Sequence, residues 1–88
     1  MEFVWDDEKR RRNLAKHGLD FTDVARIDWE SATILEDIRA NYGELRYWAF
    51  ATWNARLHLV AFALRGEKVR IISFRRASRK EVRRYGKP

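Results

Sequence analysis

The chain has 88 residues, a formal net charge of +6 and no cysteine, which excludes disulfide bonds and thiolate metal sites. Hydrophobic residues make up 45% of it, so we expect one folded domain over residues 1–88 with a small core, rather than a disordered chain. The excess of Lys and Arg favours a polyanionic partner, either nucleic acid or an acidic protein segment, although net charge alone is equally compatible with a solvated basic surface.

We expect neither export nor membrane insertion. The N-terminus "MEFVWDDEK" lacks the basic start and apolar run of a signal peptide. The longest uncharged run, "YWAFATWNA", is far too short to span a bilayer. These features predict a cytoplasmic protein with no membrane partner.

The first third of the chain predicts a short strand followed by two helices. "FVW" is the strand candidate, and Asp6 is a good N-cap for a charged helix over residues 7–17, which Gly18 ends as a left-handed C-cap. This helix is short of apolar residues, so most of its surface should meet water or a polar partner. A second short helix is expected from Asp20, where apolar residues recur at helical spacing.

The pattern changes to strands after Asp28. "SATILED" predicts one strand, and "DIRANYG" predicts a turn or loop. Three strand-like runs follow in close succession: "ELRYWAFATW", "RLHLVAFALR" and "KVRIISFR". Because only "NA" and "GE" connect these runs, we expect an antiparallel meander, and the middle run, apolar on both faces, should be a central strand.

A last helix begins at a capping box formed by Ser78 and Glu81, and its Val82 and Tyr85 share a face. The element order is therefore β-α-α-β-β-β-β-α. This order predicts an α+β domain in which a small, twisted, mainly antiparallel sheet carries the N-terminal helices and a C-terminal helix.

Three separated segments match the motifs of one family. They are "FVWDDEKRRRNLAKHGLDF", "YGELRY" and "RIISFRRASRKEVRRY". They resemble, in that order, the F-x-W-D-x-x-K-x-x-x-N-x-x-K-H-G-x-x-F opening, the G-E-x-R segment and the R-I-I-S-x-R-x-A-x-x-x-E-x-x-x-Y ending of the BrnT toxins. The match spans nearly the whole chain, which makes it more specific than any single motif.

This resemblance implies a bacterial type II toxin with a RelE-like fold, acting as a ribonuclease that arrests translation. It also implies a partner, a BrnA-type antitoxin with a ribbon-helix-helix DNA-binding domain, joined to the toxin in a heterotetramer. Two positions depart from the family pattern: Ala51 stands where members often have Gly, and Ala63 where many have Thr. Neither position is charged, so we expect them to affect substrate detail rather than the class of protein.

A metal-independent endoribonuclease needs a base near the ribose 2′-OH, an acid near the leaving 5′-oxygen, and fixed cations around the phosphorane. Because RelE-like toxins rely on cations, the resemblance makes Arg65, Arg75 and Arg76 candidate catalytic residues, although each could instead pair with an acid. The meander places Arg65 near a hairpin turn and the other two at the opposite end. Strict alternation sends Arg75 and Arg76 to opposite faces, so we expect only one of them to contact RNA.

Glu44, Arg46 and Tyr85 are further candidates. Glu44 and Arg46 lie two apart on one expected strand, so they could serve as catalytic base and RNA-binding phosphate anchor, or form a cross-strand ion pair. Tyr85 could act as the catalytic acid or as a stacking platform, or it could simply pack into the core.

The two histidines are the side chains that titrate nearest neutrality. His17 could be catalytic, because Lys9, Asn13 and His17 form a polar stripe that could face RNA; the alternative is that His17 caps the first helix. His58 sits in an apolar strand, where a buried, hydrogen-bonded histidine is the simpler interpretation, although a base held within the sheet is possible.

The last helix carries a basic band, which we define as two adjacent i, i+4 rows: Arg79, Lys80, Arg83 and Arg84. This band could bind flanking RNA phosphates or an acidic antitoxin segment, or it could be a plain solvated face. Trp48 and Trp53 fall on opposite faces of one strand, so at most one should stack on a base.

We expect no metal and no nucleotide cofactor, because no His, Asp and Glu cluster has ligand spacing and no Gly-rich loop could cradle a phosphate. Two rival interpretations share the same basic surface. One is a non-catalytic RNA- or DNA-binding module, and the other is a partner-dependent interaction domain that captures an acidic protein.

Overall fold

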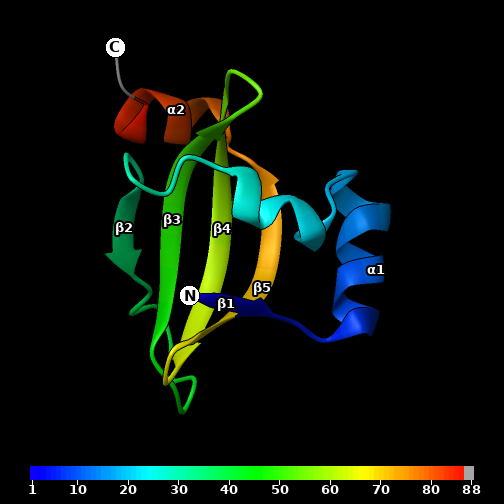
Figure 1. Cartoon of the computed structure of the whole chain (residues 1–88). Coiled ribbons are helices and arrows are strands. Elements are labelled where there is room, and N and C mark those ends of the chain that lie inside the picture. The colour runs from blue at the N-terminus through cyan, green and yellow to red at the C-terminus, as the bar shows by residue number, and fades with distance from the viewer. Residues whose placement is uncertain (87–88) are drawn as a thin grey trace.

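The computed structural model describes residues 1–86 and contains one five-stranded sheet flanked by helices (Figure 1). The elements, in chain order, are β1 (Glu2–Val4), α1 (Asp7–His17), the 3-10 helix η1 (Phe21–Arg26), β2 (Thr33–Glu36), β3 (Arg46–Trp53), β4 (Arg56–Arg65), β5 (Lys68–Arg76) and α2 (Arg79–Tyr85). This order confirms the predicted α+β class. The second helix is a 3-10 helix rather than an α-helix.

The sheet has the strand order β1-β5-β4-β3-β2. β3, β4 and β5 form the predicted antiparallel meander, with β4 at the centre, and β2 pairs antiparallel with β3 at one edge. β1 adds a short parallel strand beside β5, so the sheet is mixed.

The helix ends form as the sequence predicts. The Asp6 carboxylate accepts a hydrogen bond from the Lys9 amide at the start of α1. Gly18 ends that helix with a φ of 70°, in the left-handed region, which residues with a side chain rarely adopt. At α2 the capping box is complete, because Ser78 and Glu81 each accept from the other's amide. One expectation is corrected here: Glu44 lies in the bend before β3 and not on the strand itself.

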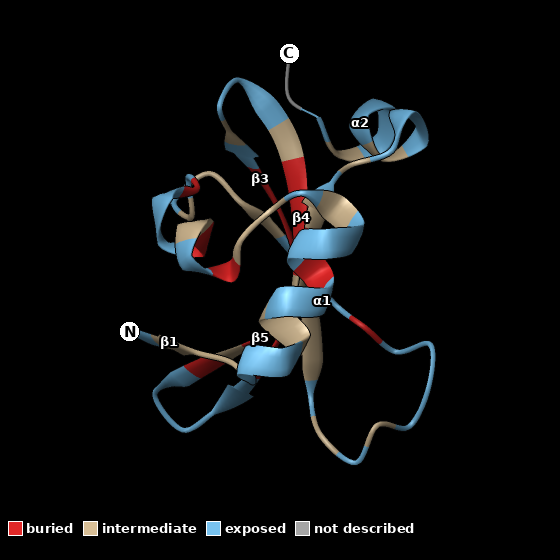
Figure 2. Cartoon of the chain, turned by 90° about the vertical axis from the view of Figure 1, so that its right-hand side faces the viewer, coloured by how far each residue is buried: buried red, intermediate tan, exposed pale blue. Residues whose placement is uncertain are grey.

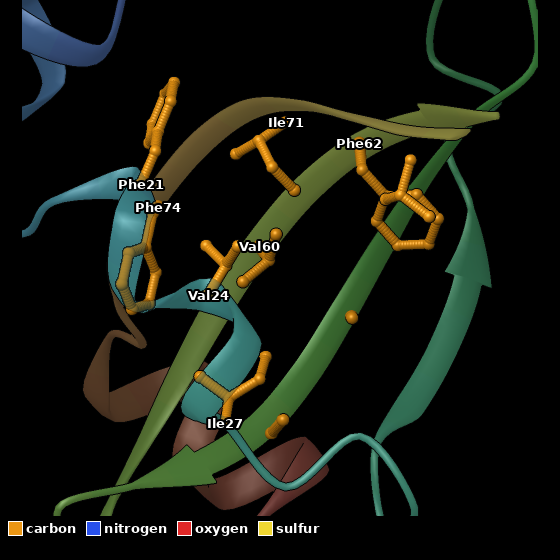
Figure 3. Close-up of a cluster of buried hydrophobic side chains, with 10 residues drawn as sticks. Phe21, Val24, Ile27, Val60, Phe62, Ile71 and Phe74 are labelled. Atoms are coloured by element: carbon orange, nitrogen blue, oxygen red, sulfur yellow. The ribbon is translucent and has the colours of Figure 1, made fainter. Parts of the chain in front are cut away.

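One face of the sheet, which we call the core face, is covered by η1. Phe21, Val24 and Ile27 of η1 pack against buried side chains from the three long strands (Figure 3). Those side chains are Ala49 and Ala51 of β3, Val60 and Phe62 of β4, and Val69, Ile71 and Phe74 of β5. Burial of this cluster fixes which residues of each strand turn away from the core, because side chains alternate between the two faces of a sheet.

The helix α1 is exposed over most of its surface, as expected from its composition (Figure 2). Its attachment to the sheet depends on Asn13, the one buried residue of α1. The Asn13 amide nitrogen donates to the Phe74 carbonyl (2.8 Å) and the Leu19 carbonyl (3.1 Å), and its oxygen accepts from the Phe74 amide (3.1 Å). The Asn13 side chain therefore makes the pair of hydrogen bonds to the Phe74 backbone that a neighbouring strand would make.

We expect Asn13→Ala to lower the free energy of unfolding by about 2–6 kcal/mol, because both Phe74 backbone groups lose their buried hydrogen-bond partner, at about 1–3 kcal/mol each. Chemical denaturation would measure the change. The matched control is Arg11→Ala on the exposed side of the same helix, which should stay within about 1 kcal/mol of the parent chain. Equal stabilities of the two variants would contradict this account of how α1 is attached.

Candidate functional site

The second face of the sheet, which we call the open face, is covered at one end by α2, where Tyr85 stacks on Phe50 with ring centroids 4.2 Å apart. Beyond that contact the open face holds a depression of about 220 Å³. Its lining combines uncharged side chains such as Ala61 with charged ones such as Arg75. The lining residues are Asp37, Arg39, Arg46, Tyr47, Trp48, Leu59, Ala61, Ile72, Ser73 and Arg75.

A β-bulge in β5 joins this depression to a second one beside α1. Ser73 pairs with Ala61 and Ile71 pairs with Phe62, so Ile72 is the extra residue. Ile72 and Ser73 line both depressions. The second depression, of about 300 Å³, is otherwise lined by Lys9, Arg12, Asn13, Lys16 and His17. We call the two depressions together the cationic groove.

Arg75 is the best fixed cation in the groove. Its Nη1 and Nη2 donate to the two Glu81 oxygens at 2.8 and 2.9 Å, and Nη1 also donates to the Arg76 carbonyl. This pairing lowers the pKa of Glu81 to about 2. Among the described residues, the Nε edge of Arg75 has no hydrogen-bond acceptor, so a guanidinium edge suited to phosphate is left over.

Arg39 is fixed by Asp37 in the loop between β2 and β3. Its Nε and Nη2 donate to the two Asp37 oxygens at 2.9 and 3.0 Å, and Tyr42 donates to the same carboxylate. These bonds, Arg39's foremost, lower the pKa of the buried Asp37 to about 2. The Arg39 guanidinium lies over the Trp48 ring, 4.5 Å from its centroid.

Glu44 joins three arginines and holds Arg46 at the groove. It accepts from Arg46 Nε at 3.0 Å and from Arg70, and it pairs with Arg65 at 3.7 Å. These contacts, led by the hydrogen bond from Arg46, lower the pKa of Glu44. A carboxylate so stabilised is a weak base, so the geometry favours the ion-pair alternative for Glu44 over the role of catalytic base.

The departure at Ala63 falls beside these arginines. Ala63 is fully buried and is the cross-strand neighbour of both Arg46 and Arg70. Arg70 Nε is buried and has no hydrogen-bond partner among the described residues. A threonine at position 63 would carry a hydroxyl beside Arg70, whose Nε lacks an acceptor. Ala63 carries none.

His17 lies at the end of α1 in the groove. Burial lowers its pKa first, and repulsion from Lys16 and from Arg75 lowers it further. The neutral imidazole therefore predominates at pH 7.

Several predicted site residues lie outside the groove. Arg65 ends β4 at the hairpin, and Arg76, opposite His58 at the other end, turns away from the open face, as alternation predicts. The residues of the basic band of α2 are exposed to solvent, and Tyr85 stacks on Phe50 rather than lining the groove. His58 is buried with Nδ1 2.9 Å from the Arg56 carbonyl, which matches the simpler interpretation.

The structure brings into the groove residues that sequence reasoning missed, chiefly Arg12, Lys16, Arg39 and Ser73. Arg12 and Lys16 could have been found, because they share the helical face of Lys9 and His17. No helical or strand periodicity pointed to Arg39, because it lies in a loop and is positioned by its side-chain bonds to Asp37. Within residues 1–86 no three potential metal-binding side chains come together, and no helix is long and apolar enough to cross a membrane.

The fold and the groove define a class: a small α+β domain that holds guanidinium groups rigidly on the open face of a curved sheet, as a protein acting on a polyanionic chain requires. Comparison with known proteins narrows this class. The family model described as "Ribonuclease toxin, BrnT, of type II toxin-antitoxin system" matches residues 5–81. A search of curated proteins found no match.

Among solved structures, the chain is similar to the ribonuclease toxin BrnT of Brucella abortus, determined at 1.1 Å. The two share 35% sequence identity over 90% of this chain and 99% of the other, with a TM-score of 0.74. The chain belongs to the BrnT family of ribonuclease toxins of type II toxin-antitoxin systems. The family predicted from the three sequence motifs is thereby confirmed, and it favours the ribonuclease interpretation over the two non-catalytic ones.

Proposed function

We propose that the chain, as a single domain over residues 1–88 acting in the cytoplasm, cleaves RNA in the cationic groove without a metal ion. The observation that carries this proposal is the convergence of Arg39, Arg46 and Arg75 on one depression that adjoins His17. Each of the three is bonded to a different carboxylate, so its charge is in place before the substrate arrives. Such preorganisation is the largest single source of rate in reactions that develop negative charge.

In the proposed reaction, neutral His17 takes the proton from a ribose 2′-OH. The 2′-oxygen then forms a bond to the adjacent phosphorus, and the bond from phosphorus to the 5′-oxygen breaks. Arg75, through its remaining edge, and Arg46 stabilise the charge that develops on the phosphoryl oxygens. The products are a 2′,3′-cyclic phosphate and a 5′-hydroxyl, whose proton comes from water, because Tyr85, the predicted acid, stacks on Phe50 outside the groove.

The lysines and arginines beside this centre would bind the flanking strand. Lys9, Arg12 and Lys16 line the α1 side of the groove, where successive phosphates could follow the helix. The basic band of α2 lies beyond the Tyr85 stack and would contact RNA further along. Arg65 and Arg76, outside the groove, have no direct part in this proposal.

The test is cleavage of labelled RNA by the purified chain with excess chelator present. We expect fragments that end in a cyclic phosphate, at the same rate with and without chelator, because arginine charge replaces the metal. Intact RNA with chelator, and cleavage restored by Mg²⁺, would overturn the metal-independent mechanism. Intact RNA under both conditions would overturn the groove as a self-sufficient active site.

We further propose that the antitoxin is of the BrnA type, with a ribbon-helix-helix domain, and that it forms a heterotetramer with the toxin. Family membership supports an antitoxin partner, and the neighbouring reading frame is where to look for it. Two surfaces outside the groove remain open to such a partner: the basic band, and an apolar hollow of about 520 Å³. The hollow lies at the uncovered end of the core face, lined by Phe3, Trp29, Ile34 and Leu64 among others.

A further inference from the structure

We propose that Arg39 and Trp48 form a stacking subsite for one RNA base, with the Arg39 guanidinium lying between the indole and the nucleobase. This inference rests on the proposed function only in taking single-stranded RNA as the ligand. Arg39 lines the same depression as Arg46 and Arg75, but neither Arg39 nor Trp48 acts on the reacting atoms in the mechanism described above. The subsite would add affinity for bases to a groove whose other contacts are made to phosphate.

The first argument is the rigidity of the guanidinium plane. Asp37 binds Arg39 through two nearly equal bonds, Nε to Oδ1 at 2.9 Å and Nη2 to Oδ2 at 3.0 Å. The Asp37 carboxylate is itself fixed, since it also accepts from the Arg39 amide and from Tyr42. A long side chain that would otherwise be mobile is therefore held in one plane, so stacking a base on it costs little conformational entropy.

The second argument is that one face of this plane is occupied and the other is open. The inner face lies on Trp48, with Cζ 4.5 Å from the ring centroid. The Arg39 side chain nevertheless remains 66% exposed, and both residues line the sheet side of the groove. Planar guanidinium groups are established stacking partners for unpaired RNA bases, and an aromatic ring behind the cation stabilises its position.

The third argument is placement. Arg39, Arg46 and Arg75 line the same depression, so a strand whose phosphate reaches Arg46 and Arg75 has its neighbouring nucleotide beside Arg39. Arg46 shows a similar arrangement, over Tyr42 at 4.1 Å, but its stacked face is turned to the loop that also holds Arg39.

The experiment compares binding of two uncleavable probes of equal length and charge: a short single-stranded RNA with methylated 2′-hydroxyls, and the same backbone without bases. The parent chain should bind the base-bearing probe more tightly. In Arg39→Lys, which keeps the charge but loses the plane, this preference should fall by about 5- to 150-fold, the range for loss of one stacked base. The salt dependence should stay unchanged, because the number of phosphate contacts is the same.

Two further variants sharpen the result. Trp48→Leu, which leaves Arg39 in place but removes its support, should lose part of the same preference. Arg26→Lys, an equally conservative change at an exposed residue of η1, should lose none of it. If Arg39→Lys keeps the full preference for bases, the stacking subsite is wrong.

The outcome separates this inference from the proposed function, because the probes cannot be cleaved. A chain that shows the loss in Arg39→Lys but never cleaves RNA supports the subsite and overturns the mechanism. A chain that cleaves RNA while Arg39→Lys binds both probes as the parent does supports the mechanism and overturns the subsite.

Discussion

Arg75→Ala should slow RNA cleavage by about 10²–10³-fold, the usual cost of removing one preorganised charge donor from a transition state. The reason is geometric: Glu81 binds one edge of the guanidinium and leaves the Nε edge in the groove. RNA affinity should change much less, since many other cations line the groove. Single-turnover cleavage at saturating protein, alongside the dissociation constant of an uncleavable RNA, measures the two effects separately.

The competing explanation is that Arg75 only anchors α2 through Glu81. Glu81→Gln distinguishes the two, because it breaks the same ion pair while leaving the Arg75 charge in the groove. Both variants should unfold more easily than the parent, yet only Arg75→Ala should lose most of its rate at a temperature where both are folded. Equal slowing by the two variants would assign Arg75 to structure alone. Arg75→Lys, with charge but no two-donor edge, should fall between them.

The fold was largely predictable because its signals are local. Two short connections force β3, β4 and β5 into a meander, and helix caps at Asp6, Gly18 and Ser78 fix where helices begin and end. The parallel pairing of β1 with β5 had no local signal, because those strands are far apart in the sequence. It depends on the path of α1, which the side chain of Asn13 attaches to β5.

The groove was predictable only in part. Helical spacing placed Lys9 and His17 together, and alternation separated Arg75 from Arg76. The bulge at Ile72 could not be predicted from the sequence. Uninterrupted alternation would put Ile71 on the same face as Arg75, whereas Ile71 lies in the core. Arg39 was missed because side-chain bonds to Asp37, rather than any periodic element, bring its loop to the groove.

A second large effect is expected at His17. His17→Ala should lower the cleavage rate by about 10²–10⁴-fold, the contribution of a well-placed general base. The matched control is Arg11→Ala, on the outer surface of the same helix and outside the groove. A His17→Ala variant that cleaves as fast as the parent would remove the histidine from the mechanism.

The pH dependence tests the same role with the sign fixed in advance. A base acts when unprotonated, and burial, Lys16 and Arg75 all lower the pKa of His17 below its ordinary 6.5. The rate should therefore be level at neutral pH and fall as the pH drops through a midpoint below 6.5. Lys16→Ala removes one repelling charge, so it should move that midpoint to higher pH. Because a residue with a purely structural role would not couple to Lys16 in this way, an unmoved midpoint would count against His17 as the proton acceptor.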